Sequence, residues 1–400
     1  ANLKLKNIAI LLYEDETLSP SLMAEAKAES TLLTLYQYHG QKSSAFTPHT
    51  LEHVVLIGTD ENNDLATIER SIAQATVVAE STALTRNLVN LPPNYCTPEY
   101  MATTAVEMAN EVGLQVKVLD KEDLQALNMG AFLAVAQGSL TPPKFIILEH
   151  NAERSEELPT VVLVGKGVTF DTGGYTIKSR DGMKGMKNDM SGGAAVIGAL
   201  RAAALLEIPL HVVGLIPAAD NMISGNAYRP DDVFTASNGK TVEIVSTDAE
   251  GRLLLADALV YASRYKPDAI VDIATLTGAC VTALGGVMAG LFCTDTQLQQ
   301  RLLEAGKLVN EPLWPLPLDE AYKKSLKSHT ADTKNSGAPR GGASIAAMFL
   351  SNFVDCACWA HIDMAGIEMR NDSIAYIPSE SASGYGTRLL IEFLRHWADL

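Results

Sequence analysis

Long apolar runs are absent from this sequence of 400 residues. The longest, such as VVLVG near Val161 and AIVDIATL near Ala269, fall far short of the roughly 20 residues that a helix needs to span a bilayer. The first residues, ANLKLKNIAILLYEDE, lack an apolar stretch followed by a cleavage site of small residues. We therefore expect neither a membrane-spanning segment nor a signal peptide.

Cysteine is scarce as well: the chain has five, at positions 96, 280, 293, 356 and 358. An odd number scattered through apolar segments predicts reduced thiols that fill the core of a cytoplasmic protein. Cys356 and Cys358 have C-x-C spacing, but no second Cys or His pair with the spacing of a zinc knuckle lies nearby. We therefore expect core-filling thiols and no zinc knuckle.

Basic residues are too few to balance the acidic ones, and the net charge is −16. This balance counts against a surface that binds nucleic acid or an anionic membrane, although a local basic patch is not excluded. Aromatic residues make up 6% of the chain and hydrophobic residues 47%. These proportions are typical of a soluble globular protein with a sizeable buried core.

The first part of the chain predicts a small α/β domain at residues 1–64. The segment NIAILLY at 7–13 has the composition of a strand, residues 18–35 have helical spacing of apolar positions, and HVVLIG at 53–58 indicates another strand.

A long helical pattern without Gly or Pro follows at residues 65–89, and LPPN at 91–94 ends it. We therefore expect residues 65–95 to form a linker helix and junction. Residues 96–400 are expected to form a second, larger domain.

The larger domain alternates short apolar runs with helical patterns. Strands are predicted at residues 145–150, 160–165, 210–216, 241–246, 269–274 and 358–363. Helices are predicted near residues 98–112, 191–206, 252–264, 295–308, 343–356 and 384–398. Because the strands are apolar almost throughout, we predict a mixed, mostly parallel central sheet covered by helices on both faces. The pair Asn238-Gly239 indicates a tight turn and an edge hairpin.

Charged side chains gather where the predicted strands and helices meet. They occur in GKGVTFDTGGYTIK after strand 160–165, in KNDMSGGAA before a helix of small residues, and in STDAEGRL after strand 241–246. In sheets of this class the ligand crevice lies beyond the carboxyl ends of the strands. The residues expected to converge there are Lys166, Asp171, Lys178, Asp189, Asp248, Glu250 and Arg252.

Four carboxylates in one crevice repel each other unless cations neutralise them. Oxygen ligands with help from nitrogen suit zinc, manganese, magnesium or cobalt. Four carboxylates are more than one zinc ion usually needs, and they suit two metal ions about 3.5–4 Å apart that share carboxylates and a water. In an extended segment residues two apart point the same way, so Asp248 and Glu250 are expected to face the ions together.

Arg252 is expected in the first turn of the next helix, where free N–H groups and the positive end of the helix dipole favour anions. This predicts a pocket for a small anion or for the developing charge of a substrate. Two roles are open to Lys166 and Lys178. A neutral lysine can bind a metal through its nitrogen, whereas a charged one can polarise a carbonyl, and the residues alone do not assign these roles.

Each charged residue taken alone has a simpler interpretation. Asp or Glu before a helix commonly caps it, which applies to Asp189 and to the DAEGR segment, and most lysines are solvated at the surface. The dinucleotide fingerprint fails at Phe170, and the P-loop, H-E-x-x-H and G-x-S-x-G patterns are absent. His361 lies in an apolar strand and is interpreted as a hydrogen-bonded core residue. NSGAPRGGAS at 335–344 predicts a tight loop before a helix and could border the site.

With these residues in view, the chain resembles the leucyl aminopeptidase family (peptidase family M17), especially its bacterial peptidase B branch. STDAEGRL is similar to the family signature NTDAEGRL, with Ser246 in place of Asn. GKGVTFDTGGYTIK, MKNDMSGGAA, DNMISGNAYRPDD and DIATLTGA also match in order and spacing. The resemblance covers about residues 80–400, whereas the first ~60 residues match poorly and their domain is shorter than in the animal and plant enzymes.

The resemblance implies two divalent metal ions, zinc and/or manganese, with magnesium or cobalt as alternatives. One would be bound by Lys166, Asp171, Asp189 and Glu250. The other would be bound by Asp171, Asp248 and Glu250 together with the Asp248 backbone carbonyl, so that Asp171 and Glu250 bridge the pair.

The resemblance also implies catalytic roles. Lys178 would be the electrophile near the scissile carbonyl, and Arg252 would hold a bicarbonate ion that takes a proton from the water shared by the metals. The implied substrate pocket consists of Met186, Thr275, Gly278 and Ala365. Since the family is hexameric, the implied assembly is a homohexamer with the catalytic domains at its centre.

The expected activity is therefore that of a metalloaminopeptidase that removes the first residue from peptides in cytoplasmic peptide turnover. Three other hypotheses were weighed: a two-metal phosphoesterase, a DNA-binding architectural protein, which the acidic balance disfavours, and an inactive scaffold, which the full ligand set disfavours. The sequence does not determine the native metal or the preferred first residue.

Overall fold

The computed structural model describes residues 5–12, 18–58, 64–369, 374–377 and 381–398. Its helices are α1 (Pro20–Leu35), α2 (Leu65–Asn90), α3 (Pro98–Val112), α4 (Lys121–Ala126), α5 (Gly130–Ala136), α6 (Arg180–Met183), α7 (Ser191–Leu205), α8 (Gly251–Ala262), α9 (Gly278–Leu284), α10 (Thr296–Leu308), α11 (Gly342–Leu350) and α12 (Thr387–Ala398). Its strands are β1 (Asn7–Leu12), β2 (His53–Gly58), β3 (Gln115–Leu119), β4 (Lys144–His150), β5 (Thr160–Gly165), β6 (Gly167–Asp171), β7 (His211–Asn221), β8 (Val233–Thr235), β9 (Thr241–Glu243), β10 (Ala269–Ala274), β11 (Ala289–Cys293), β12 (Leu313–Pro315), β13 (Thr333–Lys334) and β14 (Trp359–Asp363).

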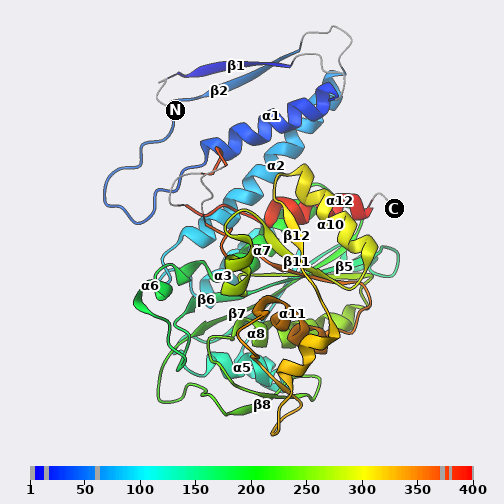
Figure 1. Ribbon diagram of the computed structural model, residues 1–400. Helices are drawn as coiled ribbons and strands as arrows, with labels where there is room; N and C mark the ends of the chain where they lie inside the picture. Colours follow the sequence, from blue (N-terminus) through cyan, green and yellow to red (C-terminus); the bar gives the residue numbers. More distant parts are fainter. Residues whose placement is uncertain (1–4, 13–17, 59–63, 370–373, 378–380, 399–400) are drawn as a thin grey trace.

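A central sheet of nine strands organises the larger part of the chain (Figure 1). The strand order is β12-β11-β14-β10-β5-β7-β4-β3, and β6 also pairs with β7. Strands β14, β10, β5 and β7 are parallel to one another, whereas β4 is antiparallel to β7, β3 to β4 and β11 to β14. The prediction of a mixed, mostly parallel α/β sheet is confirmed.

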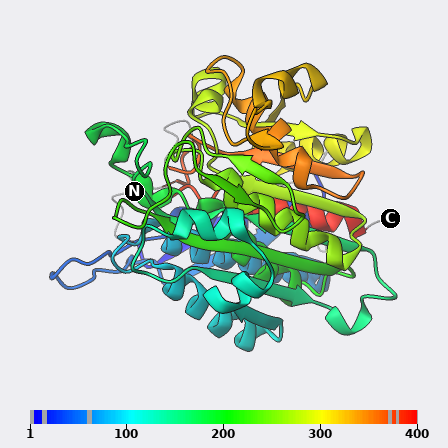
Figure 2. The same ribbon diagram turned by 90° about the horizontal axis from the view of Figure 1, so that it is seen from below.

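Both faces of this sheet are covered by helices (Figure 2). Along β5 the side chains alternate, so that Val161 and Leu163 join one buried cluster and Val162 and Val164 the other. The first cluster includes side chains of α2, α3, α7, α10 and α12, and the second includes side chains of α5, α8 and α11. Because both faces are buried, the central strands favour apolar residues at most positions, which is why they were recognisable as mostly apolar runs.

A smaller unit lies apart from the central sheet, at the top of Figure 1. Strands β1 and β2 pair in parallel, and α1 packs against α2. The last residue of the first predicted strand, Tyr13, lies outside the described residues. Glu29 pairs with Arg388 at 2.5 Å and Glu25 with Arg395 at 2.9 Å, which ties α1 to α12. The division at 1–64, 65–95 and 96–400 stays a prediction.

Several predicted elements are wrong in extent. The strand expected at 210–216 continues to Asn221, and the helix expected at 384–398 begins at Thr387. The strand expected at 241–246 ends at Glu243, because the Asn335 side chain takes the backbone N–H groups of Val245 and Ser246. The helix expected at 343–356 ends at Leu350, where polar side chains at 351 and 352 bond the last carbonyls and compete with further helical turns.

The hairpin predicted at Asn238-Gly239 exists, but its place in the fold is a correction. Strands β8 and β9 pair antiparallel on either side of this turn. Together with β13 they form a separate three-stranded sheet, not an edge of the central one.

The described residues include no helix with both the length and the apolarity needed to cross a bilayer. All five cysteines are free thiols. Cys96 and Cys280 are buried, whereas Cys293, Cys356 and Cys358 are half-buried and pack against the core clusters from their edge.

Candidate active site

Lys166 interrupts what would otherwise be one long strand. Strands β5 and β6 both run parallel to β7, and Lys166 lies between them; the register against β7 is kept up to Val168 and shifts before Asp171. Its backbone N–H donates to the Ile273 carbonyl, and its carbonyl accepts from Gly193 N–H at 2.7 Å. The break therefore lies at the carboxyl end of β5, the edge at which the crevice was expected.

Asp189 faces the site and does not cap α7. The N-cap residue of α7 is Met190, without a side-chain capping bond. The Asp189 Oδ1 atom accepts from Lys166 Nζ at 2.7 Å and from Thr275 Oγ1 at 2.8 Å. Its Oδ2 atom is buried without a hydrogen-bond partner. The capping interpretation of Asp189 is therefore wrong.

Asp248 and Glu250 reach the site from a turn. The expectation of an extended segment is wrong, because Glu250 has helical backbone angles (φ −79°, ψ −40°) at the N-cap position of α8. Its side chain makes no capping hydrogen bond. Thr247, which directly precedes Asp248, anchors this turn. Its Oγ1 donates to the Gly173 carbonyl at 2.6 Å, and its carbonyl accepts from Asn221 Nδ2 at 2.9 Å.

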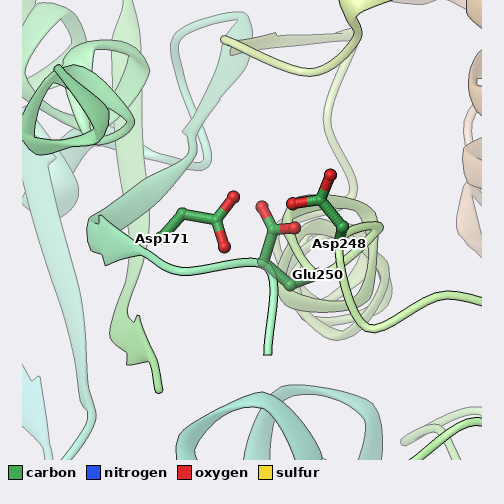
Figure 3. Close-up of side chains that lie close together, drawn as sticks. All are labelled: Asp171, Asp248 and Glu250. Atoms are coloured by element: carbon green, nitrogen blue, oxygen red, sulfur yellow. The ribbon is translucent and has the colours of Figure 1, made fainter. Parts of the chain in front are cut away.

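The carboxyl groups of Asp171, Asp248 and Glu250 lie close together (Figure 3). Asp171 ends β6, whereas the other two precede α8. One oxygen from each residue lies within 4.8 Å of the others, which is the arrangement that could hold a metal ion. Thus three of the four predicted carboxylates converge directly, and Asp189 is joined to Glu250 through Lys166.

Each of the two lysines forms ion pairs with two carboxylates. Lys166 Nζ lies 2.7 Å from Asp189 and 2.9 Å from Glu250. Lys178 Nζ lies 2.8 Å from Asp171 and 2.6 Å from Asp248. The interpretation of these two residues as solvated surface lysines is therefore wrong.

The close packing of these charged side chains shifts the pKa values of the carboxyl groups. Burial, reinforced by the neighbouring Glu250 carboxylate, raises the pKa of Asp171 to about 6 despite the two lysines. Burial also raises the pKa of Asp189. Burial acts in the same direction on Glu250, but Lys166 and Lys178 outweigh it and lower its pKa. The cluster thus carries more negative charge than its lysines stabilise, and further positive charge would relieve it.

The chemistry of this donor set fits divalent cations. It offers carboxylate oxygens, one of them unpartnered at Asp189, and one amine nitrogen at Lys166. Oxygen with some nitrogen suits zinc, manganese, magnesium and cobalt. A glycine makes room for the amine, since a Cβ at position 251 would lie 2.4 Å from Lys166 Cε.

Arg252 lies beside this cluster in the first turn of α8. Its Nη1 donates to the Asn335 carbonyl at 2.8 Å, and its Nε is buried without a partner. Burial lowers the pKa of the guanidinium to about 10. A cavity of about 180 Å³ adjoins it, bordered by the loop before α11, as the sequence of 335–344 suggested. An unpartnered donor at a helix N-terminus fits the predicted anion pocket.

The carboxylate cluster lies in a cavity of about 280 Å³, which we call the main cavity. Nearly all the predicted site residues line it. Of these, Lys166, Asp171, Lys178, Asp189, Asp248 and Glu250 line it together with Met186, Thr275, Gly278 and Ala365. Arg252 lines the adjoining cavity, which shares Asp248 and Gly278 with the main one.

Sequence reasoning missed other lining residues: Asn188, Leu276, Thr277, Val281, Gly366 and Glu368. Some had a signal, because Asn188 lies inside a quoted motif and Leu276 and Thr277 follow β10. Glu368 had only its position shortly after β14. His361 is a buried core residue, as predicted, and its Nδ1 lies 2.5 Å from Asp272.

Comparison with known proteins identifies the family of this chain. The model of the cytosol aminopeptidase family catalytic domain matches residues 83–391. The chain is 45% identical over 346 residues to a probable cytosol aminopeptidase of Burkholderia lata, covering 86% of this chain and 67% of that one. It is 44% identical over 370 residues to one of Geotalea uraniireducens, covering 92% and 74%. The chain thus spans about two thirds to three quarters of the length of these relatives.

A solved structure is also similar over nearly the whole chain. The bottromycin maturation enzyme BotP, in complex with Mn, has a TM-score of 0.90 and 36% identity, covering 99% of this chain and 84% of that one. The resemblance inferred from the motifs is confirmed by the family match and by these relatives. The chain belongs to the cytosol aminopeptidase family, peptidase family M17, and is a hydrolase of the leucyl aminopeptidase type that acts on N-termini.

Proposed function

We propose that this chain hydrolyses the first peptide bond of peptides with two divalent metal ions held in the main cavity. The observation that carries the proposal is the convergence of Asp171, Asp248 and Glu250, with ligand atoms within 4.8 Å of one another. The unpartnered oxygen of Asp189 adds a further acceptor in the same cavity.

The proposed ligand sets share two residues. Lys166, Asp171, Asp189 and Glu250 hold one ion, and Asp171, Asp248 and Glu250 hold the other with the Asp248 carbonyl. Lys166 must release its proton to bind through nitrogen, so loading of this site is coupled to proton release. Zinc and manganese are the proposed ions, with magnesium or cobalt as alternatives.

When bound, two such ions activate a shared water as the nucleophile and polarise the scissile carbonyl. The chain supplies the remaining groups. Lys178 carries an ammonium at the edge of the same cavity, where it can donate to the oxyanion that forms from the carbonyl. Arg252, with its free Nε, is proposed to hold a bicarbonate ion that accepts and relays the proton.

The substrate is held at its amino end. Asp189 is proposed to receive the free α-amine, which restricts cleavage to the first bond. The first side chain then lies among Met186, Thr275, Gly278 and Ala365. We further propose that the enzyme is a homohexamer and serves peptide turnover in the cytoplasm.

The test compares three chromogenic substrates: leucine p-nitroanilide, its N-acetylated form and p-nitrophenyl phosphate. We expect turnover of the first alone, abolished by chelation and restored by zinc or manganese. Equal turnover of the acetylated anilide would contradict an amine-anchored exopeptidase. Turnover of the phosphate ester alone would show a two-metal phosphoesterase instead.

A further inference from the structure

A fifth carboxylate lines the main cavity, apart from the proposed metal ligands. Glu368 shares the cavity wall with Asn188, Ala365 and Gly366. Its Oε1 accepts from Asn188 Nδ2 at 2.9 Å, and its Oε2 accepts from Gly366 N–H at 2.6 Å. Both donors are neutral, so they orient the carboxylate without balancing its charge.

Glu368 differs in this respect from the other carboxylates of the cavity. Asp171, Asp189, Asp248 and Glu250 each lie within 3 Å of a lysine ammonium. Among the described residues, no Lys, Arg or His nitrogen forms an ion pair with Glu368. Burial raises its pKa. A cation entering the cavity at this wall would be stabilised by it.

The position of Glu368 is fixed by the surrounding structure. Its backbone carbonyl accepts from Ser383 N–H at 2.9 Å and from Ser383 Oγ at 3.0 Å. The Ser383 carbonyl in turn accepts from the buried Arg86 at 3.0 Å. The carboxylate is therefore held at the wall from both its backbone and its side chain, as a selective contact requires.

The rest of this wall is apolar or small. Met186, Val281, Ala365 and Gly366 line the same cavity as Glu368, and Met186 and Ala365 belong to the predicted substrate pocket. Apolar residues next to a single carboxylate suit a side chain with an aliphatic stem and a cationic end. Lysine and arginine have this form, since they bury their stems and keep the charge at the tip.

From these contacts we propose that Glu368 selects peptides whose first residue is lysine or arginine, by pairing with the charged end of that side chain. This rests on the proposed aminopeptidase function and names its substrate class. A purely structural role would consist of holding the Gly366 turn to Asn188. Binding of the substrate α-amine would be a third role, and it would affect every first residue equally.

The test replaces Glu368→Gln in the metal-loaded enzyme. Glutamine keeps the size of the side chain, can accept from Gly366 and can donate to the Asn188 carbonyl oxygen after that amide rotates, so only the charge is lost. The exposed Asp181→Asn is the matched control, because it removes a surface carboxylate outside the cavity. The substrates are the p-nitroanilides of lysine, arginine and norleucine, the last having a similar stem without charge.

We expect kcat/KM for the lysine and arginine anilides to fall at least about tenfold in Glu368→Gln, because a buried charge pair is lost. The value for norleucine should stay within about twofold, which also shows that the variant is folded. Parallel losses on all three substrates, or an unchanged lysine-to-norleucine ratio, would overturn the assignment and leave the aminopeptidase intact. Absence of turnover of every anilide by the unaltered enzyme would overturn the proposed function, and this assignment with it.

Discussion

Lys178 joins two carboxylates that come from different parts of the chain. Its ammonium lies 2.8 Å from Asp171, at the end of β6, and 2.6 Å from Asp248, before α8. The attraction of these carboxylates outweighs burial and raises the pKa of the ammonium, so it stays charged at neutral pH. A fixed positive charge at this position can stabilise the negative oxygen that develops during hydrolysis.

Replacing Lys178→Met keeps an apolar stem and removes the charge. We expect kcat for leucine anilide to fall by about 10²–10³-fold, the usual loss for one donor to an oxyanion. Bound metal should be unchanged, because Lys178 lies outside the proposed ligand set. Metal analysis and steady-state kinetics of the purified variant measure both quantities. The exposed Lys184→Met serves as the control, and turnover equal to that of the unaltered enzyme in Lys178→Met would exclude the proposed role.

Gly251 determines where Lys166 can lie. A Cβ there would come within 2.4 Å of Lys166 Cε and 2.7 Å of Nζ, so Gly251→Ala must displace the amine from Asp189 and Glu250. We expect a loss in kcat of about 10²-fold, as for misplacement of a group by about 1 Å. Gly225→Ala is the control, since its Cβ meets no atom within 4 Å. Equal activity of the two variants would show that the position of Lys166 is not important for turnover.

Among single residues, the sequence predicted those that belong to the motifs. Lys166, Asp171, Asp189, Asp248 and Glu250 were recognisable because their types and spacing are unusual together. Asn335 and Glu368 were not, because each acts through a contact with residues distant in sequence. Asn335, for example, bonds the backbone of Val245 and Ser246 about ninety residues away. No local pattern encodes such a contact.

Among the helices, α2 contacts both parts of the molecule through one buried arginine. Arg86 donates to the carbonyls of Leu33, Ser383 and Tyr376, and it stacks on the Tyr36 ring. Burial lowers its pKa to about 10, because this cation lies among carbonyls and forms no ion pair with a carboxylate of the described residues. The helix thereby connects α1 to the segments that precede α12.

Arg86→Ala should lower the free energy of unfolding by about 3–5 kcal/mol, because it leaves buried carbonyls unpaired and creates a cavity. Urea unfolding followed by circular dichroism measures this loss. Arg70→Ala on the exposed face of the same helix provides the comparison and should change stability by less than about 0.5 kcal/mol. A similar small change in both variants would contradict the structural role of Arg86.

Elements were predictable where burial determines composition. Strands β5 and β10 begin and end at the predicted residues, because the sheet is covered on both faces and nearly every position is apolar, with Asp272 of β10 as the charged exception. The sequence missed β6, because Lys166 separates this short strand from β5 and the charged Asp171 ends it. It also missed β3, whose positions alternate between exposed and covered, and the short helices α4 and α5. Edge strands carry weaker patterns because only one face is buried.

For the whole molecule, the balance of positive and negative charge in the main cavity determines how metal removal affects stability. Lys166 and Lys178 already neutralise part of the acidic cluster, and the apolar clusters on both faces of the sheet do not depend on it. We therefore expect chelation to leave the fold intact and to lower the melting temperature by a few degrees only, about what loss of a ligand that contributes 2–3 kcal/mol produces.

Far-UV circular dichroism and thermal unfolding with and without a chelator measure this effect. The double variant Asp171→Asn with Asp248→Asn is the reference, and its melting temperature should respond less to chelation than that of the unaltered enzyme, because two of the five proposed ligands are changed. Loss of secondary structure on chelation would show that the ions are needed for folding, contrary to the charge balance seen here.

The most direct test of the account is a metal titration of the chelated enzyme. Manganese or zinc is added in steps while bound metal and leucine anilide turnover are measured on the same sample. We expect turnover to rise from near zero and to reach its maximum at two bound ions per chain, and we expect Glu250→Gln not to reach that maximum. Full turnover with no bound divalent ion, or an unaltered titration in Glu250→Gln, would contradict this expectation.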